Sequence, residues 1–209
     1  MRDDAAPQGM AYQWISDLDP VGIDLLDVDN DDGTAAAKLV QRYAVAVVGF
    51  ALVGDFAARD GSRGLRLLRG GEGGGVSGGL SRGLMAQGWF SGDDECSWPG
   101  ITCDALGSVS DIRLPGKDLE GTVPTEIGAF ARTLTYLDLA ENMIGGTMPD
   151  GLYDCTELEG LFLEHNQLTG SIGDGVGQLQ NLKKLYLGNN RLEGTLPGKK
   201  MDNLRQLSE

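Results

Sequence analysis

A sequence repeat that begins at residue 109 constrains the fold of this chain more than any other feature. Its unit reads Leu-x-x-Leu-x-Leu-x-x-Asn-x-Leu-x-Gly-x-Ile, where x is a variable position and other apolar residues replace some of the Leu and Ile. The units begin at Val109, Leu134, Leu158, Leu182 and, for an incomplete fifth, Leu204. Successive starts are therefore 25, 24, 24 and 22 residues apart. Repeats of this length predict a solenoid in which each coil buries its apolar side against the next.

The Asn of the repeat is expected to be structural. Three units carry it, as Asn142, Asn166 and Asn190, and the first unit has Lys117 in its place. We expect the three amides to stack as a ladder that pairs with buried backbone groups of neighbouring coils.

The Gly-x-Ile/Leu/Val-Pro ending of most units resembles the plant-type leucine-rich repeat of receptor-like kinases, receptor-like proteins and polygalacturonase-inhibiting proteins, and similar repeats occur in algal proteins. The resemblance covers about residues 89–209, with the repeats at 109–209. It implies an α/β fold, a right-handed leucine-rich-repeat solenoid with a short parallel β-sheet on its concave face. It also implies a second short strand at the Gly-x-Ile-Pro segment and helical turns on the convex side.

Residues 87–108 resemble the cysteine-containing cap that precedes plant-type repeats, because Cys, Trp, Gly, Thr and Cys follow one another in the family's order. The resemblance implies a disulfide between Cys96 and Cys103. It also implies that Trp98 covers the open end of the first coil. The alternative is a pair of free thiols in a reducing compartment.

The chain before the cap divides into three segments of different composition. Residues 1–34 are rich in Asp and are expected to form a disordered acidic lead. Residues 35–60 lack proline and place apolar side chains at helical spacing, so we predict a cap-like α-helix. Residues 61–86 are rich in Gly and Arg and are expected to form a flexible insertion. The N-terminal region is thus predicted to be α-helical and partly disordered.

The variable positions of the repeat are the candidate functional residues, because the apolar positions of each strand point into the core. Aromatic residues and Arg are the side chains that protein contact surfaces favour. The predicted ligand-binding residues on the concave face are Arg113, Tyr136, Asp138, Phe162, Glu164, His165, Lys184 and Tyr186. The alternative is that these side chains only favour strand formation on a solvated sheet.

These residues predict a non-catalytic recognition module that binds a protein, peptide or glycan ligand on the concave face, in cell-surface recognition or signalling. The alternative is a structural or assembly fragment of a larger leucine-rich repeat protein, with no ligand of its own. An incomplete fifth repeat leaves an apolar coil edge, so we also expect association through the C-terminal end.

Charge and motifs argue against other functions. A net charge of −14 disfavours nucleic acid and anionic membrane surfaces. We predict no cofactor and no metal site. Counted from Asp27, a calcium loop needs Gly at position six and Glu at position twelve, which are Asp32 and Lys38 here, and no strand precedes the glycine-rich stretch 73–78. We predict no catalysis, since His165, the single histidine, has no nucleophile in register and Cys155 is expected to be buried.

The expected location is the cell surface or the extracellular space, with the cytoplasm as the alternative. The paired cap cysteines favour an oxidising compartment. The longest apolar run, residues 44–53, is too short to cross a bilayer, and no signal peptide is predicted at the start of the sequence. Glycosylation acceptor sequences of the type Asn-x-Ser/Thr are absent, which argues mildly against a heavily glycosylated exterior.

Overall fold

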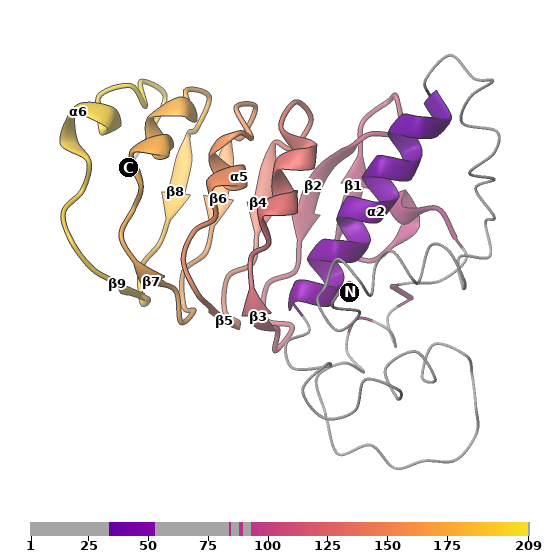
Figure 1. Ribbon diagram of the computed structural model, residues 1–209, viewed down its shortest axis with the longest axis horizontal. Coiled ribbons are helices and arrows are strands. Elements are labelled where there is room, and N and C mark those ends of the chain that lie inside the picture. The colour runs from indigo at the N-terminus through magenta and orange to yellow at the C-terminus, as the bar shows by residue number, and fades with distance from the viewer. Residues whose placement is uncertain (1–33, 53–83, 85–87, 90–92, 209) are drawn as a thin grey trace, which may run out of the picture.

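The computed structural model describes residues 34–52, 84, 88–89 and 93–208. These residues form a stack of similar coils with a helix lying across its N-terminal end (Figure 1). The predicted acidic lead, the candidate calcium loop and most of the predicted Gly/Arg insertion lie outside the described residues. The predicted fold class, an α/β leucine-rich-repeat solenoid, is confirmed by the strands described next.

A five-stranded sheet runs along one side of the stack (Figure 1). In spatial order it contains β1 (Ile101–Cys103), β2 (Val109–Arg113), β4 (Tyr136–Asp138), β6 (Gly160–Phe162) and β8 (Lys184–Tyr186). The last four strands come one from each repeat and pair in parallel, as predicted. Strand β1 comes from the cap and pairs with β2 in the antiparallel direction, so it covers the N-terminal edge of the parallel sheet.

The other sides of each coil are built from shorter elements. Second strands pair in parallel as β3 (Glu120–Thr122) with β5 (Met143–Gly145), and β7 (Thr169–Gly170) with β9 (Arg191–Leu192). Helical segments are η2 (Glu95–Ser97) in the cap, then η3 (Thr125–Phe130), α5 (Asp150–Tyr153), η4 (Asp174–Gln178) and α6 (Gly198–Met201) in successive coils. Proline precedes three of them, where its fixed φ and missing N–H suit a helix start.

The core is a column of apolar side chains, with one layer for each repeat. The Leu-x-x-Leu-x-Leu positions of the first three units are fully buried, namely Val109, Ile112 and Leu114, then Leu134, Leu137 and Leu139, then Leu158, Leu161 and Leu163. In the fourth unit Leu182 is buried, but Leu185 and Leu187 are only partly buried. The repeat positions therefore point inward as the sequence predicts, and burial weakens toward the C-terminal end.

The fifth coil begins three residues later than the spacing predicts. Ser208 donates its backbone N–H to the carbonyl oxygen of Lys183 at 2.9 Å, and Lys183 bonds to the coil before it in the same way. Leu207, which precedes Ser208, therefore stands in the place of Leu182, and the predicted start at Leu204 is wrong. The last two starts are residues 182 and 207, which are 25 apart.

Leu204 takes a different place in the repeat. It is buried, and its N–H donates to the carbonyl of Met201, as the N–H of Leu179 donates to that of Val176 in the coil before. The pair Leu204 and Leu207 is thus equivalent to Leu179 and Leu182. The sequence misleads here because both pairs have the spacing Leu-x-x-Leu.

The asparagine amides connect neighbouring coils. The Oδ1 of Asn142 accepts from the backbone N–H groups of Lys117 and Leu119 at 2.9 and 3.0 Å, and its Nδ2 donates to the carbonyl of Leu114 at 2.9 Å. Asn166 and Asn190 make the bonds equivalent to those of Asn142 with Leu119 and Leu114, one coil further on each time. Each amide therefore satisfies backbone groups that no regular element pairs.

Helix α2 (Thr34–Leu52) packs against η3 and β3 of the first coil. The predicted helix extends to residue 60, and its last eight residues lie outside the described part of the chain. Every residue from 44 to 52 is buried, so the C-terminal half of α2 belongs to the core. No helix among the described residues is both long and apolar enough to span a membrane.

Two polar side chains of α2 hold the cap against the first repeat. Gln41 accepts from the backbone N–H of Val109 at 2.8 Å and donates to the carbonyl of Gly107 at 3.0 Å. Arg42 and Glu95 form a buried ion pair at 3.0 Å. Removing one partner of such a pair would leave an uncompensated buried charge, which is strongly destabilising.

The cap contains a disulfide and a buried pair of tryptophans. Cys96 and Cys103 are bonded, with their Cα atoms 5.5 Å apart. Trp98 is almost fully buried and lies 5.4 Å from Trp89, centroid to centroid, with the Arg42 guanidinium 5.5 Å from the Trp98 ring. The cap therefore closes the N-terminal end of the solenoid with aromatic side chains.

Candidate functional site

The outward-facing positions of β2, β4, β6 and β8, with the second and third residues after each strand, form the sheet face. Strand register places six of the eight predicted residues in two columns, because parallel neighbours align side by side, and Glu164 and His165 follow β6. One column is Arg113, Asp138, Phe162 and Tyr186, and the other is Asp111, Tyr136, Gly160 and Lys184. Neighbouring members of a column lie on adjacent strands, so their side chains can contact one another.

Two aromatic rings of the first column are stacked. The centroids of Phe162 and Tyr186 lie 5.3 Å apart, and the ring planes differ by 13°. Phe162 is half-buried, whereas Tyr186 is 46% exposed. The pair therefore presents aromatic surface to solvent on the last two strands of the sheet, β6 and β8.

A third ring contacts a cation. The guanidinium carbon of Arg113 lies 4.6 Å from the centroid of the Tyr136 ring, a cation–π contact. Arg113 also forms an ion pair with Asp111 at 3.2 Å. The Tyr136 hydroxyl donates to Oε2 of Glu159 at 3.2 Å. Both the charge of Arg113 and the hydroxyl of Tyr136 are thus engaged within the sheet face.

Gly160 allows the rings of Tyr136 and Phe162 to approach each other. A Cβ at this position would lie 2.6 Å from Cδ1 of Tyr136 and 2.7 Å from Cε2 of Phe162, which is too close for either contact. The two rings therefore occupy the space that a side chain on β6 would fill. Arg113, Tyr136, Phe162 and Tyr186 form one continuous surface, here named the aromatic strip.

Glu159 precedes β6 and forms an ion pair with a lysine side chain. It pairs with Lys183 at 2.7 Å, and this hydrogen bond lowers the pKa of the Glu159 carboxyl below its ordinary value. Sequence reasoning does not select Glu159, Asp111 or Gly160. A glycine in a column of large side chains is a usable signal, but the two carboxylates matter only through partners that the fold provides.

Three carboxylates line the sheet face where its strands end, namely Asp138 at the end of β4, Glu141 beyond β4 and Glu164 beyond β6. Asp138 accepts a hydrogen bond from the backbone N–H of Ala140 at 3.1 Å. The Oε2 atom of Glu164 is buried and has no hydrogen-bond partner among the described residues. None of the three forms an ion pair within the described part of the chain. This end of the strands is therefore an acidic surface.

His165 lies in a turn rather than on a strand. Its φ of 56° is in the left-handed region, as are those of Glu141 (58°) and Asn189 (55°) at the same place in adjacent coils. The exposed imidazole Nε2 lies 3.1 Å from Nδ2 of Asn189. The residue before each ladder asparagine thus adopts a conformation that L-residues disfavour.

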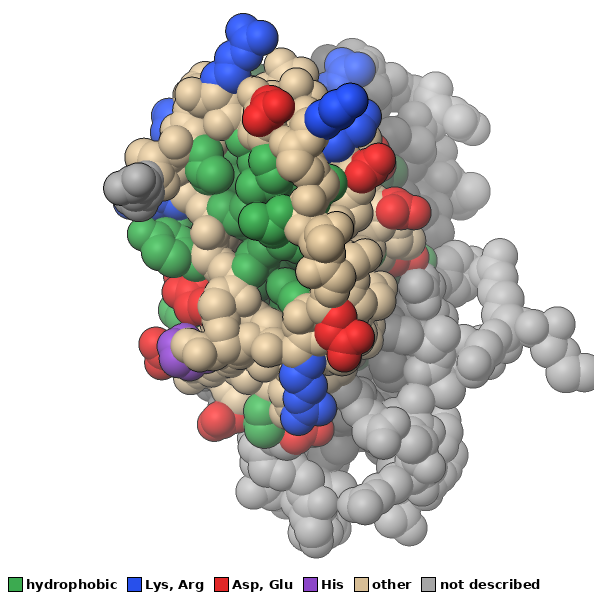
Figure 2. Space-filling view, turned by 90° about the vertical axis from the view of Figure 1, so that its left-hand side faces the viewer, with side chains coloured by type: hydrophobic (Ala, Val, Ile, Leu, Met, Phe, Trp, Pro, Cys, Tyr) green, Lys and Arg blue, Asp and Glu red, His purple; other side chains and the backbone are tan. Residues whose placement is uncertain are grey.

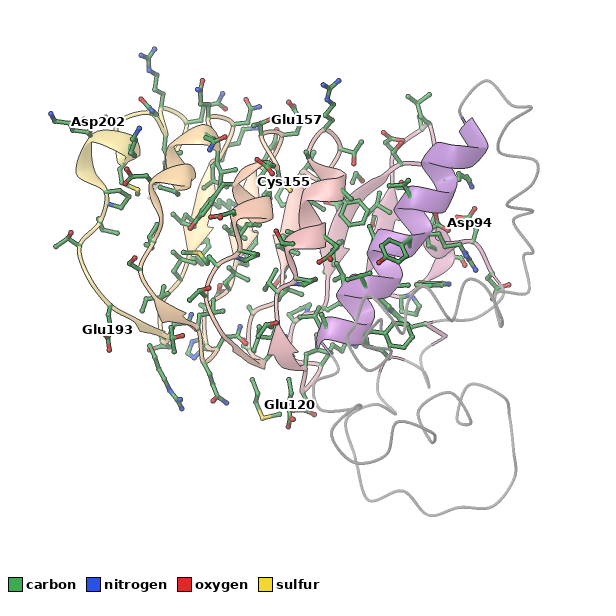
Figure 3. All side chains as sticks on the ribbon, viewed as in Figure 1. Asp94, Glu120, Cys155, Glu157, Glu193 and Asp202 are labelled. Carbon is green, nitrogen blue, oxygen red and sulfur yellow. A yellow bond between two sulfur atoms is a disulfide. The ribbon has the colours of Figure 1, made fainter. Side chains whose placement is uncertain are left out.

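Cys155 lies in the core, away from the sheet face (Figure 3). Burial raises the pKa of its thiol to about 12. The thiol therefore stays protonated at neutral pH, which agrees with the expected small apolar role. Among the described residues, no group of three or more His, Cys, Asp or Glu side chains is arranged to hold a metal ion.

The C-terminal end of the stack is apolar. Hydrophobic side chains gather at the centre of this end, as Figure 2 shows. Leu196 is 64% exposed and Leu207 is 38% exposed, and Leu185, Leu187 and Leu192 are only partly buried. This is the coil edge that the repeat pattern predicts.

Two family descriptions match the repeats. "Leucine Rich repeats (2 copies)" matches residues 156–199, and "Leucine Rich Repeat" matches residues 133–155. Both matches lie within the four complete repeats. They cover the coils that carry Tyr136, Phe162 and Tyr186.

Similar proteins are plant receptors. The chain is 38% identical over 72 residues to the LRR receptor-like serine/threonine-protein kinase RGI3 of Arabidopsis thaliana, which is 34% of this chain and 7% of that protein. The Arabidopsis HAESA ectodomain, solved with an N-terminally extended IDA peptide hormone, is 30% identical with a TM-score of 0.54, over 61% of this chain and 21% of that one. The BIR2 ectodomain of Arabidopsis thaliana is 27% identical with a TM-score of 0.53, over 60% and 73%. The chain thus spans a small part of RGI3 and HAESA, and most of the BIR2 ectodomain.

Proposed function

We propose, from the premise that the repeats of this chain are plant-type leucine-rich repeats, that its sheet face is the binding surface of a non-catalytic recognition module. The ligand class that we favour is a peptide or a peptide segment of a protein. The HAESA ectodomain, which has a similar fold, was solved with a peptide hormone. A glycan remains the alternative ligand, since sugar rings also stack on aromatic side chains.

The aromatic strip carries this proposal. Large aromatic side chains that are only partly buried on a rigid sheet are typical of the residues that dominate protein binding energy. The stack of Phe162 on Tyr186, at 5.3 Å, fixes both rings before a ligand arrives. A preorganised surface of this kind loses little conformational entropy on binding.

Cross-strand aromatic pairs also stabilise sheets, so the strip has a purely structural explanation as well. The two explanations differ in what truncation does. If the strip only stabilises the sheet, Phe162→Ala lowers the free energy of unfolding and changes no binding. If the strip binds, the same variant loses a ligand that a control variant keeps.

A selection experiment tests the proposal. A phage-displayed library of random peptides is selected on the immobilised protein, and the enriched peptides are assayed against Phe162→Ala. The control is Met143→Ala, which removes an exposed apolar side chain from β5, outside the sheet face. We expect Phe162→Ala to lose binding and Met143→Ala to keep it. Peptides that bind both variants equally would contradict the proposal.

We place the module on the cell surface or outside the cell. The disulfide between Cys96 and Cys103 supports this location, because disulfides persist in oxidising compartments. HAESA and BIR2 are themselves described as ectodomains. In protein isolated from its source without reductant, iodoacetamide should leave both cap cysteines unmodified. Modification of both would favour the cytoplasmic alternative.

The kinase activity of RGI3 is not carried over to this chain, because the match covers 72 residues and 7% of that protein. The apolar C-terminal end supports a second role, association with another chain. Light scattering over a dilution series tests it. A mass that falls on dilution, and that Leu196→Lys reduces to that of one chain, would support association, and a constant monomer mass would exclude it.

A further inference from the structure

We propose that the sheet face contains a subsite for a basic side chain, formed by Asp138, Ala140, Phe162 and Glu164, which anchors an arginine or lysine of the ligand. The inference rests on the proposed function and adds the chemistry of the partner, a basic peptide. These four residues are named the basic-residue subsite.

The four residues form a square on two adjacent coils. Asp138 and Phe162 are register partners on β4 and β6, so their Cα atoms are about 5 Å apart. Ala140 and Glu164 follow them by two positions on the same side, about 7 Å further along the chain. The pairing continues past the strands, because the N–H of Glu141 donates to the carbonyl of Glu164 at 3.0 Å. The two carboxylates therefore lie at opposite corners, a span that a guanidinium group can bridge.

Small neighbours leave room in this square. Ala140 contributes only a methyl group at the third corner. On the other side of Glu164, Gly188 faces open space, since an added Cβ would meet nothing within 4 Å. The backbone N–H of His165 donates to the carbonyl of Gly188 at 2.9 Å, which places the two coils side by side here. A long side chain can therefore reach Glu164 from above the sheet.

The ring of Phe162 supplies the fourth corner. The ring stacks on that of Tyr186, and its edge fills part of the space left by the missing side chain of Gly160. A guanidinium or ammonium group within about 6 Å of a ring face gains a cation–π interaction. The same arrangement already occurs in this protein, with Arg113 over Tyr136 at 4.6 Å.

Neither carboxylate of the subsite forms an ion pair within the described part of the chain. Oε2 of Glu164 is buried without a hydrogen-bond partner among the described residues, an arrangement that costs free energy. Arg113 is the register partner of Asp138, but its ion pair is with Asp111. Lys184 is exposed and lies on the far side of Tyr186 from the acidic end of the strands.

The overall charge acts in the same direction. The chain carries a net charge of −14, so its field attracts a basic partner and repels an acidic one. Aromatic side chains alone would also fit a sugar ring. The two carboxylates beside Phe162 are what favour a cationic peptide over a neutral glycan.

The test uses random peptides selected on the wild-type protein. We expect them to be enriched in Arg or Lys, and replacement of the basic residue by citrulline or norleucine to weaken binding about tenfold or more. Asp138→Asn and Glu164→Gln should each weaken binding by a similar factor, and high salt should weaken it further. Glu193→Gln is the matched control, since Glu193 is exposed and follows β9, outside the sheet face (Figure 3).

The outcomes separate this inference from the proposed function. Peptides that need Phe162 but contain no basic residue, or that bind Glu164→Gln and Asp138→Asn unchanged, would overturn the subsite and leave the binding surface intact. Binding that requires Phe162 on a glycan array, with no peptide selected, would also overturn the subsite. If neither the peptide library nor the glycan array yields a ligand that depends on Phe162, the proposed function itself is overturned. Thermal unfolding of each variant checks that it is folded.

Discussion

The ring of Tyr136, on the neighbouring strand, occupies the space next to Gly160 that a side chain would otherwise fill. A Cβ on Gly160 would lie only 2.6 Å from Cδ1 of Tyr136. Tyr136 of one coil therefore packs against Gly160 of the next. The continuity of the aromatic strip depends on this relationship, because Phe162 approaches the same gap from its own strand.

Gly160→Ala tests this contact. The new methyl group forces both rings away, and we expect the free energy of unfolding to fall by about 1–3 kcal/mol, as for other overpacked sites. The near-ultraviolet circular dichroism of the aromatic residues should change as well. Gly188→Ala is the matched control, since its Cβ would enter open space, and its effect should stay within about 0.5 kcal/mol. Equal effects of the two substitutions would contradict the packing described.

The asparagine ladder predicts a loss of stability without a loss of apolar volume. Asn166→Ala leaves the buried N–H of Ile144 and the carbonyl of Leu139 without their partners, so urea unfolding should show a loss of about 1–3 kcal/mol or more. Asn181→Ala removes a single exposed bond to the carbonyl of Thr156 and should cost less than about 1 kcal/mol. If the two variants were equally stable, the ladder would not hold the coils together.

The left-handed backbone at His165 predicts a stabilising substitution. Glycine adopts a φ of 56° without strain, so His165→Gly should raise the free energy of unfolding by about 1 kcal/mol, the difference between the relief and the added chain entropy. Denaturant unfolding measures it. A loss of stability would mean that the contact of the imidazole with Asn189 outweighs the backbone strain.

Acid should destabilise the junction between α2 and the cap. The hydrogen bond from Lys38, and then that from the backbone N–H of Cys96, hold the pKa of Asp94 below its ordinary value of 3.8. A lowered pKa in the folded state contributes stability that is fully present above the ordinary value and is lost as the pH falls through the lowered one. Unfolding measured between neutral pH and pH 2 should therefore show a smaller acid loss in Asp94→Asn than in the wild type. An unchanged acid profile would exclude this contribution.

Much of the fold follows from the sequence because its determinants are local and repeated. The Leu-x-x-Leu-x-Leu spacing predicts which side chains are buried, and the register of β2, β4, β6 and β8 reproduces the columns read from the repeats. The predicted start of the fifth coil is wrong. The pair Leu204 and Leu207 has the spacing Leu-x-x-Leu, which occurs at two different places in the repeat. The antiparallel strand β1 is not predicted, because it lies outside the repeats.

The site is less predictable than the fold. Column membership follows from the repeat, but the lean of Tyr136 and Phe162 toward Gly160 depends on packing between strands. The hydrogen bonds of Gln41 with Gly107 and Val109 join residues more than sixty positions apart, so no local sequence pattern predicts them. Which side chains of the sheet face touch a ligand stays a prediction.

The central claim, that the sheet face binds a ligand through its aromatic strip, is tested most directly at Tyr186. The measurement is calorimetric titration of a peptide selected on the wild-type protein into Tyr186→Ala and into Met143→Ala, with urea unfolding of both. The account predicts that Tyr186→Ala weakens binding by about thirtyfold or more, the size of a contact hot spot, while its stability changes by only about 1 kcal/mol. Unchanged affinity in a folded Tyr186→Ala protein would contradict it.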